Sequence, residues 1–213
     1  MHRPRSIAAR GGQNADALRL SAVRGIIRRV TKLVLSPDKS RVRIRTFAEG
    51  LFSRLAHDLE LVCRDLSGNA ERADDGSGTA TLEIPIARID VSGTLKDGRV
   101  DPGGLSSSDR NDCLAKMRKD VFHASGDRGA VVRVEASVAS GRARIRIIPP
   151  NGRTLERDVS VRLEHEADNG ARASGSTAIS LEALGSAPVK GPMNAFRMKD
   201  QVEVHFELVL EAR

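Results

Sequence analysis

From about residue 31 onward, apolar and polar residues alternate with a period of two. Residues 40–46 read Ser-Arg-Val-Arg-Ile-Arg-Thr, which places cations and aliphatic side chains on opposite faces of an extended segment. The alternation predicts a first strand that ends at Leu35, and further strands at 40–46, 58–64, 79–86, 89–91, 132–136, 142–147, 158–163, 172–180 and 202–210. Short strands separated by Gly, Asn and Asp turns predict an all-β sandwich or barrel.

Two segments interrupt the alternation and predict helical structure. Residues 47–56 are typical of a helical turn or short helix between two strands. Ser106 and Asp109 have capping-box spacing and predict the start of a longer helix after a loop at 96–104. Leu114, Met117 and Val121 would then form one apolar stripe that faces the sheet.

The composition narrows the class of protein. Of the 213 residues, 39% are hydrophobic, which excludes a disordered chain. Only two cysteines, Cys63 and Cys113, are present, which excludes a disulfide scaffold and favours two free thiols. No apolar run approaches the roughly 20 residues of a membrane-spanning helix.

The basic charge is concentrated at one end of the chain. The net charge is +7, and residues 1–30 contain seven arginines and a single acid, Asp16, so the remainder is nearly neutral. We expect two parts: a basic N-terminal arm, residues 1–30, disordered or partly helical, and a barrel domain, residues 31–213. The arm suits contact with a membrane surface or a nucleic acid, whereas no nucleic acid is expected on the barrel.

The arm also bears on the compartment. It contains arginines but no apolar stretch of about 7–15 residues, so it does not match a secretory signal. This predicts a cytoplasmic protein, or a periplasmic one if the true start differs.

Four segments occur in an order typical of one known family. They are residues 35–40 (Leu-Ser-Pro-Asp-Lys-Ser), 108–112 (Ser-Asp-Arg-Asn-Asp), 120–124 (Asp-Val-Phe-His-Ala) and 195–202 (Ala-Phe-Arg-Met-Lys-Asp-Gln-Val). Together with the strand pattern, residues 31–212 resemble the YceI-like family of lipocalin-like antiparallel β-barrels. The chain departs from the family in lacking a signal peptide and the Pro-x-Ile-x-Phe strand after the helix. The resemblance implies non-enzymatic binding, carriage or sequestration of an isoprenoid-type lipid or quinone, with no cofactor.

An antiparallel barrel of about eight strands is either filled by its own side chains or wide enough for one small apolar ligand. With five Phe, no Trp and no Tyr, the interior has few large side chains, which favours a hollow. The candidate ligand-binding residues are Val42, Ile44, Leu51, Phe52, Leu55, Leu59, Leu61, Leu82, Ile84, Phe122, Val132, Val134, Val161, Val204 and Phe206. Each of them is also compatible with an ordinary hydrophobic core.

Polar residues leave several alternatives open. Arg54, Arg197 and Lys199 lie near predicted loop ends, where they could hold an anionic head group or simply face solvent. The five histidines have no metal-binding spacing, and His205 is expected to face solvent. A hydrolase or lyase that uses His57 or His123 is the enzymatic alternative. Binding of anionic surfaces through the arm is another, and a homodimer is compatible with all of them.

Overall fold

The computed structural model describes residues 30–50, 57–166, 170–191 and 197–213. Its strands are β1 (Val30–Leu35), β2 (Arg41–Thr46), β3 (Ala48–Glu49), β4 (Asp58–Cys63), β5 (Ser67–Ala73), β6 (Gly78–Pro85), β7 (Ile89–Lys96), β8 (Arg99–Asp101), β9 (Val131–Ala139), β10 (Arg142–Ile148), β11 (Leu155–His165), β12 (Ala171–Ser180), β13 (Arg197–Met198) and β14 (Gln201–Ala212). The helical elements are α1 (Ser107–Lys116), the π-helical segment Met117–Val121 that continues it, and the 3-10 turns Pro37–Lys39 and Ile86–Arg88.

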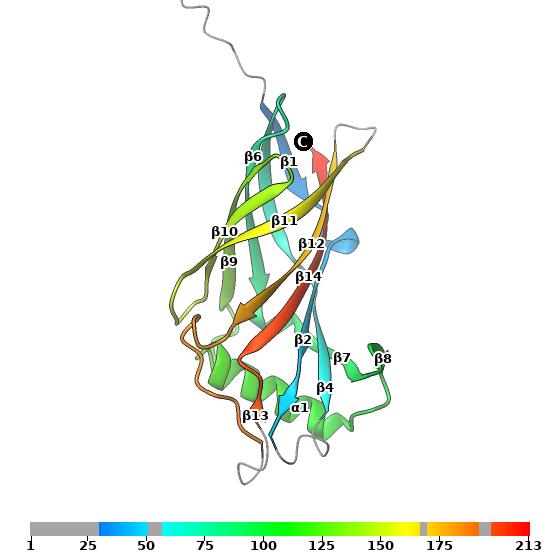
Figure 1. Cartoon of the computed structure of the whole chain (residues 1–213), viewed down its shortest axis with the longest axis vertical. Coiled ribbons are helices and arrows are strands. Elements are labelled where there is room, and N and C mark those ends of the chain that lie inside the picture. Colours follow the sequence, from blue (N-terminus) through cyan, green and yellow to red (C-terminus); the bar gives the residue numbers. More distant parts are fainter. Residues whose placement is uncertain (1–29, 51–56, 167–169, 192–196) are drawn as a thin grey trace, which may run out of the picture.

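Eight antiparallel strands close into a ring. Their order is β1-β5-β6-β9-β10-β11-β12-β14, and β14 pairs with β1 to complete the circle. Figure 1 shows these strands as a tilted wall around the long axis of the molecule. The predicted all-β class and antiparallel lipocalin-like barrel are therefore confirmed.

Below the ring, the sheet continues on one side as four further strands, which we call the leaf. After β14, the sheet order runs on through β2, β4, β7 and β8. Two of the crossings from ring to leaf are the 3-10 turns: the first links β1 to β2, and the second links β6 to β7. As a result, β14 pairs with β1 near its end and with β2 nearer its middle.

Ser40 makes the first of these crossings possible. On one edge, β14 pairs first with β2 and then with β1, and Val209 lies at the gap between these two partner strands. Val209 is buried, so its backbone groups on this edge need other partners. The hydroxyl of Ser40 accepts a hydrogen bond from the Val209 N–H at 3.0 Å, and the Ser36 N–H donates to the Val209 carbonyl at 2.8 Å. A buried backbone group without a partner is costly, so these contacts allow the chain to bend without breaking the wall.

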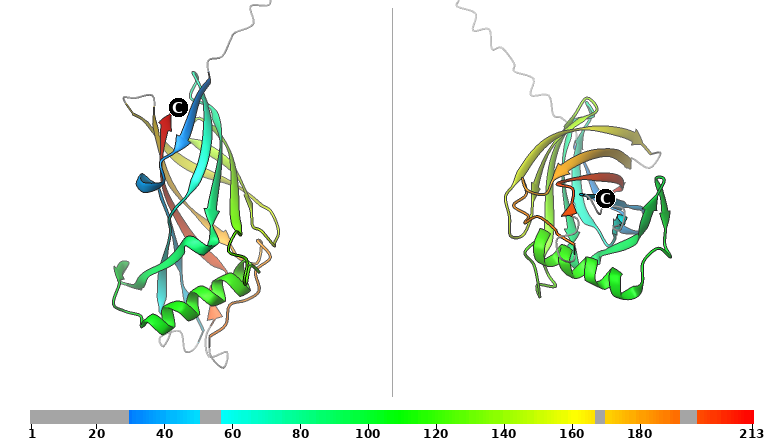
Figure 2. Two further views of the ribbon diagram at one scale, coloured as in Figure 1. Left: turned by 180° about the vertical axis from the view of Figure 1, so that it is seen from behind. Right: turned by 60° about the horizontal axis from the view of Figure 1, so that its bottom comes forward.

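The α1 helix lies across the lower end of the wall (Figures 1 and 2). Ser106 caps the helix as its spacing with Asp109 predicts: its hydroxyl accepts from the Asp109 N–H at 3.1 Å and donates to the Asp109 carboxylate at 2.7 Å. Arg110 fastens the helix to the leaf by donating to the carbonyl oxygens of Val91 and Pro102.

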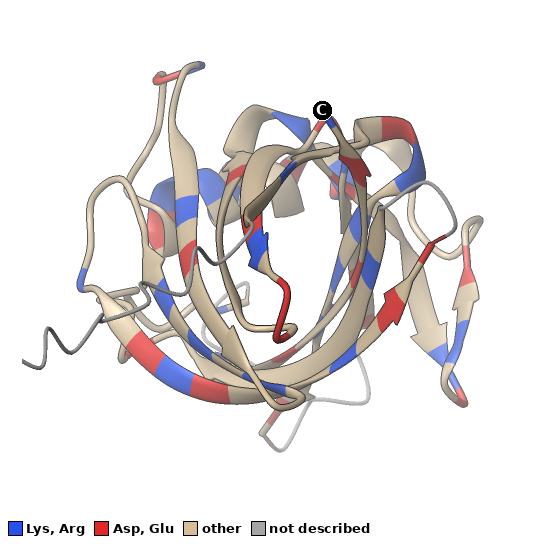
Figure 3. Ribbon diagram, turned by 90° about the horizontal axis from the view of Figure 1, so that it is seen from above, with Lys and Arg blue, Asp and Glu red and all other residues tan. Residues whose placement is uncertain are grey.

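The outer face of the wall is highly charged but balanced. Figure 3 shows Lys and Arg interspersed with Asp and Glu around the strands. Arg41 and Arg43 both contact Glu207 at 2.7 Å, and Arg45 contacts Glu60 at 2.9 Å. Further pairs join neighbouring strands at Arg133–Glu83, Arg144–Asp158, Arg146–Glu135 and Arg172–Glu166. The alternating arginines of β2 are therefore neutralised within the sheet.

Some local predictions need correction. Ala48 and Glu49, predicted as helical, form β3 and pair with Met198 and Arg197 of β13, and the Ala48 N–H donates to the Asp58 carboxylate at 2.8 Å, so its partner lies outside any helix. Residues 51–56 of the same prediction lie outside the described residues. Within the predicted loop 96–104, residues Arg99–Asp101 form β8.

One strand of the ring, β5, was not predicted, and the predicted arm lies almost wholly outside the described residues. β5 has the polar, small-residue sequence Ser-Gly-Asn-Ala-Glu-Arg-Ala and is held by pairing with β1 and β6 on both sides. Of the predicted arm, only its last residue, Val30, is described, and it begins β1. The predicted membrane or nucleic-acid contacts of the arm therefore lie outside the described residues.

Candidate ligand cavity

The barrel contains a cavity of about 730 Å³. Side chains from all eight ring strands line it, together with residues of β2, β4, β7 and α1. This volume lies within the roughly 300–1,000 Å³ that is common for small-molecule sites. The interior is therefore a hollow and not a filled core.

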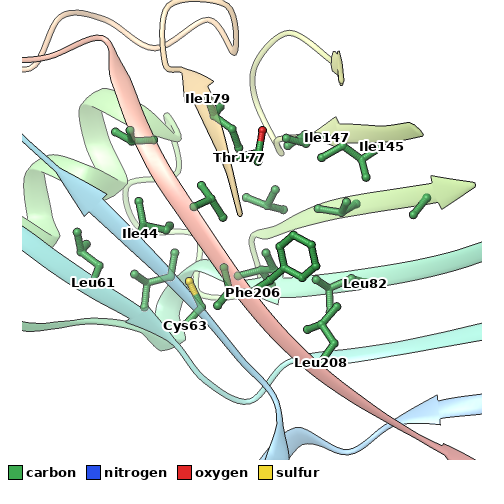
Figure 4. Close-up of a pocket in the computed structure, with 18 of the residues that line it drawn as sticks. Ile44, Leu61, Cys63, Leu82, Ile145, Ile147, Thr177, Ile179, Phe206 and Leu208 are labelled. Carbon is green, nitrogen blue, oxygen red and sulfur yellow. The ribbon is translucent and has the colours of Figure 1, made fainter. Parts of the chain in front are cut away.

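Strand alternation explains why the hollow is apolar. On β14, Val202, Val204, Phe206, Leu208 and Leu210 all face the cavity, whereas the residues between them point to the outer face. Val204, Phe206 and Leu208 remain partly accessible although the wall is closed around them, because they border empty space. Figure 4 shows such side chains pointing from several strands into the same space.

The predicted ligand-binding residues that the structure describes share one location. The described ones all line this cavity: Val42, Ile44, Leu59, Leu61, Leu82, Ile84, Phe122, Val132, Val134, Val161, Val204 and Phe206. Leu51, Phe52 and Leu55 lie outside the described residues. Contact of the lining residues with a ligand stays a prediction.

Small residues make up much of the lining and were not predicted. They include Ala70, Ala80, Ala136, Ala143 and Ala173. Alanine carries a weak hydropathy signal, so the usable clue for Ala80, Ala136, Ala143 and Ala173 is their position on a predicted strand in line with larger inward residues. These short side chains leave the space that the cavity occupies.

Both cysteines are free and line the cavity. Cys63 is fully buried in β4, and burial raises the pKa of its thiol to about 12. Cys113 on α1 is partly buried; burial, and then the carboxylates of Asp109 and Asp112, raise its pKa as well. Both thiols therefore stay protonated at neutral pH and act as apolar wall groups.

At the lower end, α1 contributes polar as well as apolar groups to the lining. Asp109, Asp112 and Lys116 are exposed and border the cavity, alongside Cys113 and Met117. Met117 and Val121 belong to the predicted stripe, but Leu114 packs against the core without bordering the cavity. The cavity-facing stripe is therefore rotated slightly from the predicted one.

The cations considered for a head group have partners of their own. Arg197 contacts the Glu49 carboxylate at 2.6 Å, and the Lys199 ammonium lies 5.7 Å from the centre of the Phe47 ring. The cavity lining includes Phe47 but neither of these two cations. Arg54 lies outside the described residues.

The histidines are dispersed over the molecule. His57 borders the lower end of the cavity, whereas His123 lies outside its lining and its Nε2 is 3.1 Å from the Gly185 carbonyl. His205 is on the outer face as predicted, but it is half-buried instead of solvent-facing, with its Nε2 enclosed 3.5 Å from the Glu203 carboxylate. In the described part of the chain, no three His, Cys, Asp or Glu side chains gather as a metal site would require.

Comparison with known proteins supports the fold. No family model matches the chain, and no curated protein is similar to it in sequence. The structure is similar to the crystal structure of BcnA from Burkholderia cenocepacia, with a TM-score of 0.55 and 15% identity over 82% of this chain and 98% of BcnA. This likeness supports the expected YceI-like barrel fold, and at this identity it shows the fold alone.

Among the described residues, no helix combines the length and the apolar character needed to cross a bilayer.

Proposed function

We propose that the barrel binds an elongated apolar molecule of the isoprenoid-lipid or quinone type, without catalysing a reaction. The observation that carries this proposal is the hollow of about 730 Å³ lined by inward aliphatic side chains. A cavity of this size surrounded by apolar groups is unfavourable for water and favourable for a hydrocarbon chain.

The energetics are adequate for such a ligand. Burial of hydrocarbon contributes about 0.8 kcal/mol per CH₂, so each five-carbon isoprene unit contributes roughly 4 kcal/mol. Three or four units offset an association cost of about 4–15 kcal/mol and can reach micromolar affinity. A hydrocarbon ligand forms no ion pair with the wall. This fits the absence of charged side chains from the inward positions of β9, β10 and β14.

Native mass spectrometry with solvent extraction of the purified protein tests the proposal directly. We expect a co-purifying prenyl lipid or quinone, or uptake of farnesol and geranylgeraniol by the emptied protein. A protein that retains nothing and takes up neither alcohol would contradict the proposal.

A matched pair of variants assigns the binding to the cavity. Ala136 faces inward on β9 and Ser137, its neighbour, is exposed on the outer face. Ala136→Phe should fill the hollow and abolish uptake, whereas Ser137→Phe should leave it unchanged. Equal uptake by the two variants would place the ligand outside the barrel.

A further inference from the structure

The upper end of the cavity is bordered by Arg72 on β5 and His165 at the end of β11. The Arg72 guanidinium donates through Nη1 to His165 Nδ1 at 3.0 Å and to the Gly170 carbonyl at 3.1 Å. Arginine has no acceptor atom, so Nδ1 of His165 must accept this bond and the ring proton lies on Nε2. Arg72 thus joins β5 to the start of β12 and the end of β11.

The strand order shows where this contact runs. In the closed ring, β5 and β11 are four strands apart in either direction, which makes them opposite each other. Arg72 pairs with Thr31 and has the same inward parity as Ala70, while His165 has the same inward parity as Leu163 and Val161. A hydrogen bond between inward side chains on opposite strands has to cross the lumen.

We propose that Arg72 is a strap that closes the upper end of the cavity and makes it a blind end for the bound chain. The Arg72 side chain is partly buried, and its hydrogen bonds to His165 and to the Gly170 carbonyl hold it from the far side of the ring. The end of the hydrocarbon ligand in the cavity then meets the Arg72 guanidinium. The contact between Arg72 and a ligand rests on the proposed function, whereas closure of the upper end by Arg72 does not.

Thiol labelling tests the closure without any ligand. Leu208 faces the cavity on β14, so Leu208→Cys places a reporter thiol inside the wall, which N-ethylmaleimide can reach only through an opening. Loss of a hydrogen bond to a charged group should raise the labelling rate about tenfold when Leu208→Cys is combined with Arg72→Met. Peptide mass spectrometry separates this site from Cys63 and Cys113.

Three further variants complete the test. Arg172 is an exposed arginine on β12 that contacts Glu166 at 3.2 Å on the outer face, so Arg172→Met should leave the labelling rate unchanged. His165→Leu removes the acceptor and should open the end, whereas His165→Gln retains an acceptor and should keep it closed. The His165 variants also test the strap if Arg72→Met fails to fold.

The result that overturns the strap is an equal labelling rate in Arg72→Met and the parent, or an equal rise in Arg172→Met. Dissociation of the neutral probe N-phenyl-1-naphthylamine provides the second readout and should be faster in Arg72→Met. If this probe binds none of the variants while labelling still responds to Arg72→Met, the strap stands and the proposed function fails.

Discussion

The ring of Phe206 lies directly over Gly175 on the cavity side of the wall. The two residues face each other on β14 and β12, and a Cβ built on Gly175 would come within 2.6 Å of Cζ of Phe206. It would also come within 2.7 Å of the Ser160 carbonyl oxygen. The missing side chain of Gly175 therefore gives the only aromatic ring on an inward position of β14 a place against the wall.

Gly175→Ala should lower the free energy of unfolding by about 1–3 kcal/mol, the usual cost of overpacking. Phe206→Leu in the same chain should recover only part of this loss, because the Ser160 carbonyl stays in place. Urea unfolding of both single variants and the double variant measures the coupling. Ser176→Ala, on the outer face of the same strand, is the control, and a Gly175→Ala protein as stable as this control would contradict the close approach.

Cys63 should resist alkylation in the folded protein. Burial raises the pKa of its thiol to about 12, so at pH 8 the reactive thiolate is scarce as well as enclosed. Iodoacetamide followed by peptide mass spectrometry should find Cys113 modified first, since it is only partly buried, and Cys63 modified only after unfolding in urea. Equal rates for Cys63 in native and unfolded protein would show that the wall of β4 is not closed.

The ion pair between Arg45 and Glu60 is the least exposed of the pairs in the described chain. Glu60 is buried, and its carboxylate lies 2.9 Å from Nε of Arg45. Arg45→Met should destabilise the protein by about 3 kcal/mol, because it leaves a charge enclosed without its partner. The double variant Arg45→Met with Glu60→Leu should recover most of that stability in urea unfolding. A double variant no more stable than Arg45→Met alone would show that the pair is not the cause.

Glu207 should make the stability of the protein depend on pH in acid. The hydrogen bond from Arg41 is the main cause that lowers the pKa of Glu207. Burial opposes this hydrogen bond with a smaller effect, and the charges of Arg41 and Arg43 lower the pKa further. A carboxyl whose pKa is lowered on folding stabilises the folded state above its unfolded value of about 4.5, and this contribution is lost as the pH falls through the folded value.

Glu207→Gln should therefore cost less than about 1 kcal/mol at pH 7, as for a partly exposed pair, and nothing near pH 2. Urea midpoints at the two pH values measure this difference. Glu182→Gln, an exposed loop glutamate, serves as the reference variant. A Glu207→Gln defect that is the same at both pH values would mean that packing, and not charge, is responsible.

The alternation along the chain predicts an all-β sandwich or barrel and the inward face of most strands, and the resemblance to the YceI-like family favours the barrel. Val42, Ile44 and Phe206 were assigned to the wall because each alternates with a charged neighbour. β5 was missed because its inward residues, Gly68, Ala70 and Arg72, include no large apolar side chain, and because its stability comes from two partner strands. The contact of Arg72 with His165 joins residues 93 positions apart on opposite strands, so it depends on ring closure, which no local pattern reports.

The division of the wall into ring and leaf makes its two ends mechanically unequal. Around the ring every strand has a partner on both sides, so a change of girth there must break backbone hydrogen bonds. The leaf is bounded by the short strand β8 and is fastened across the base by Arg110 of α1. Widening of the cavity at the leaf end would strain the side-chain contacts of Arg110 and leave the backbone hydrogen bonds of the eight-stranded ring intact.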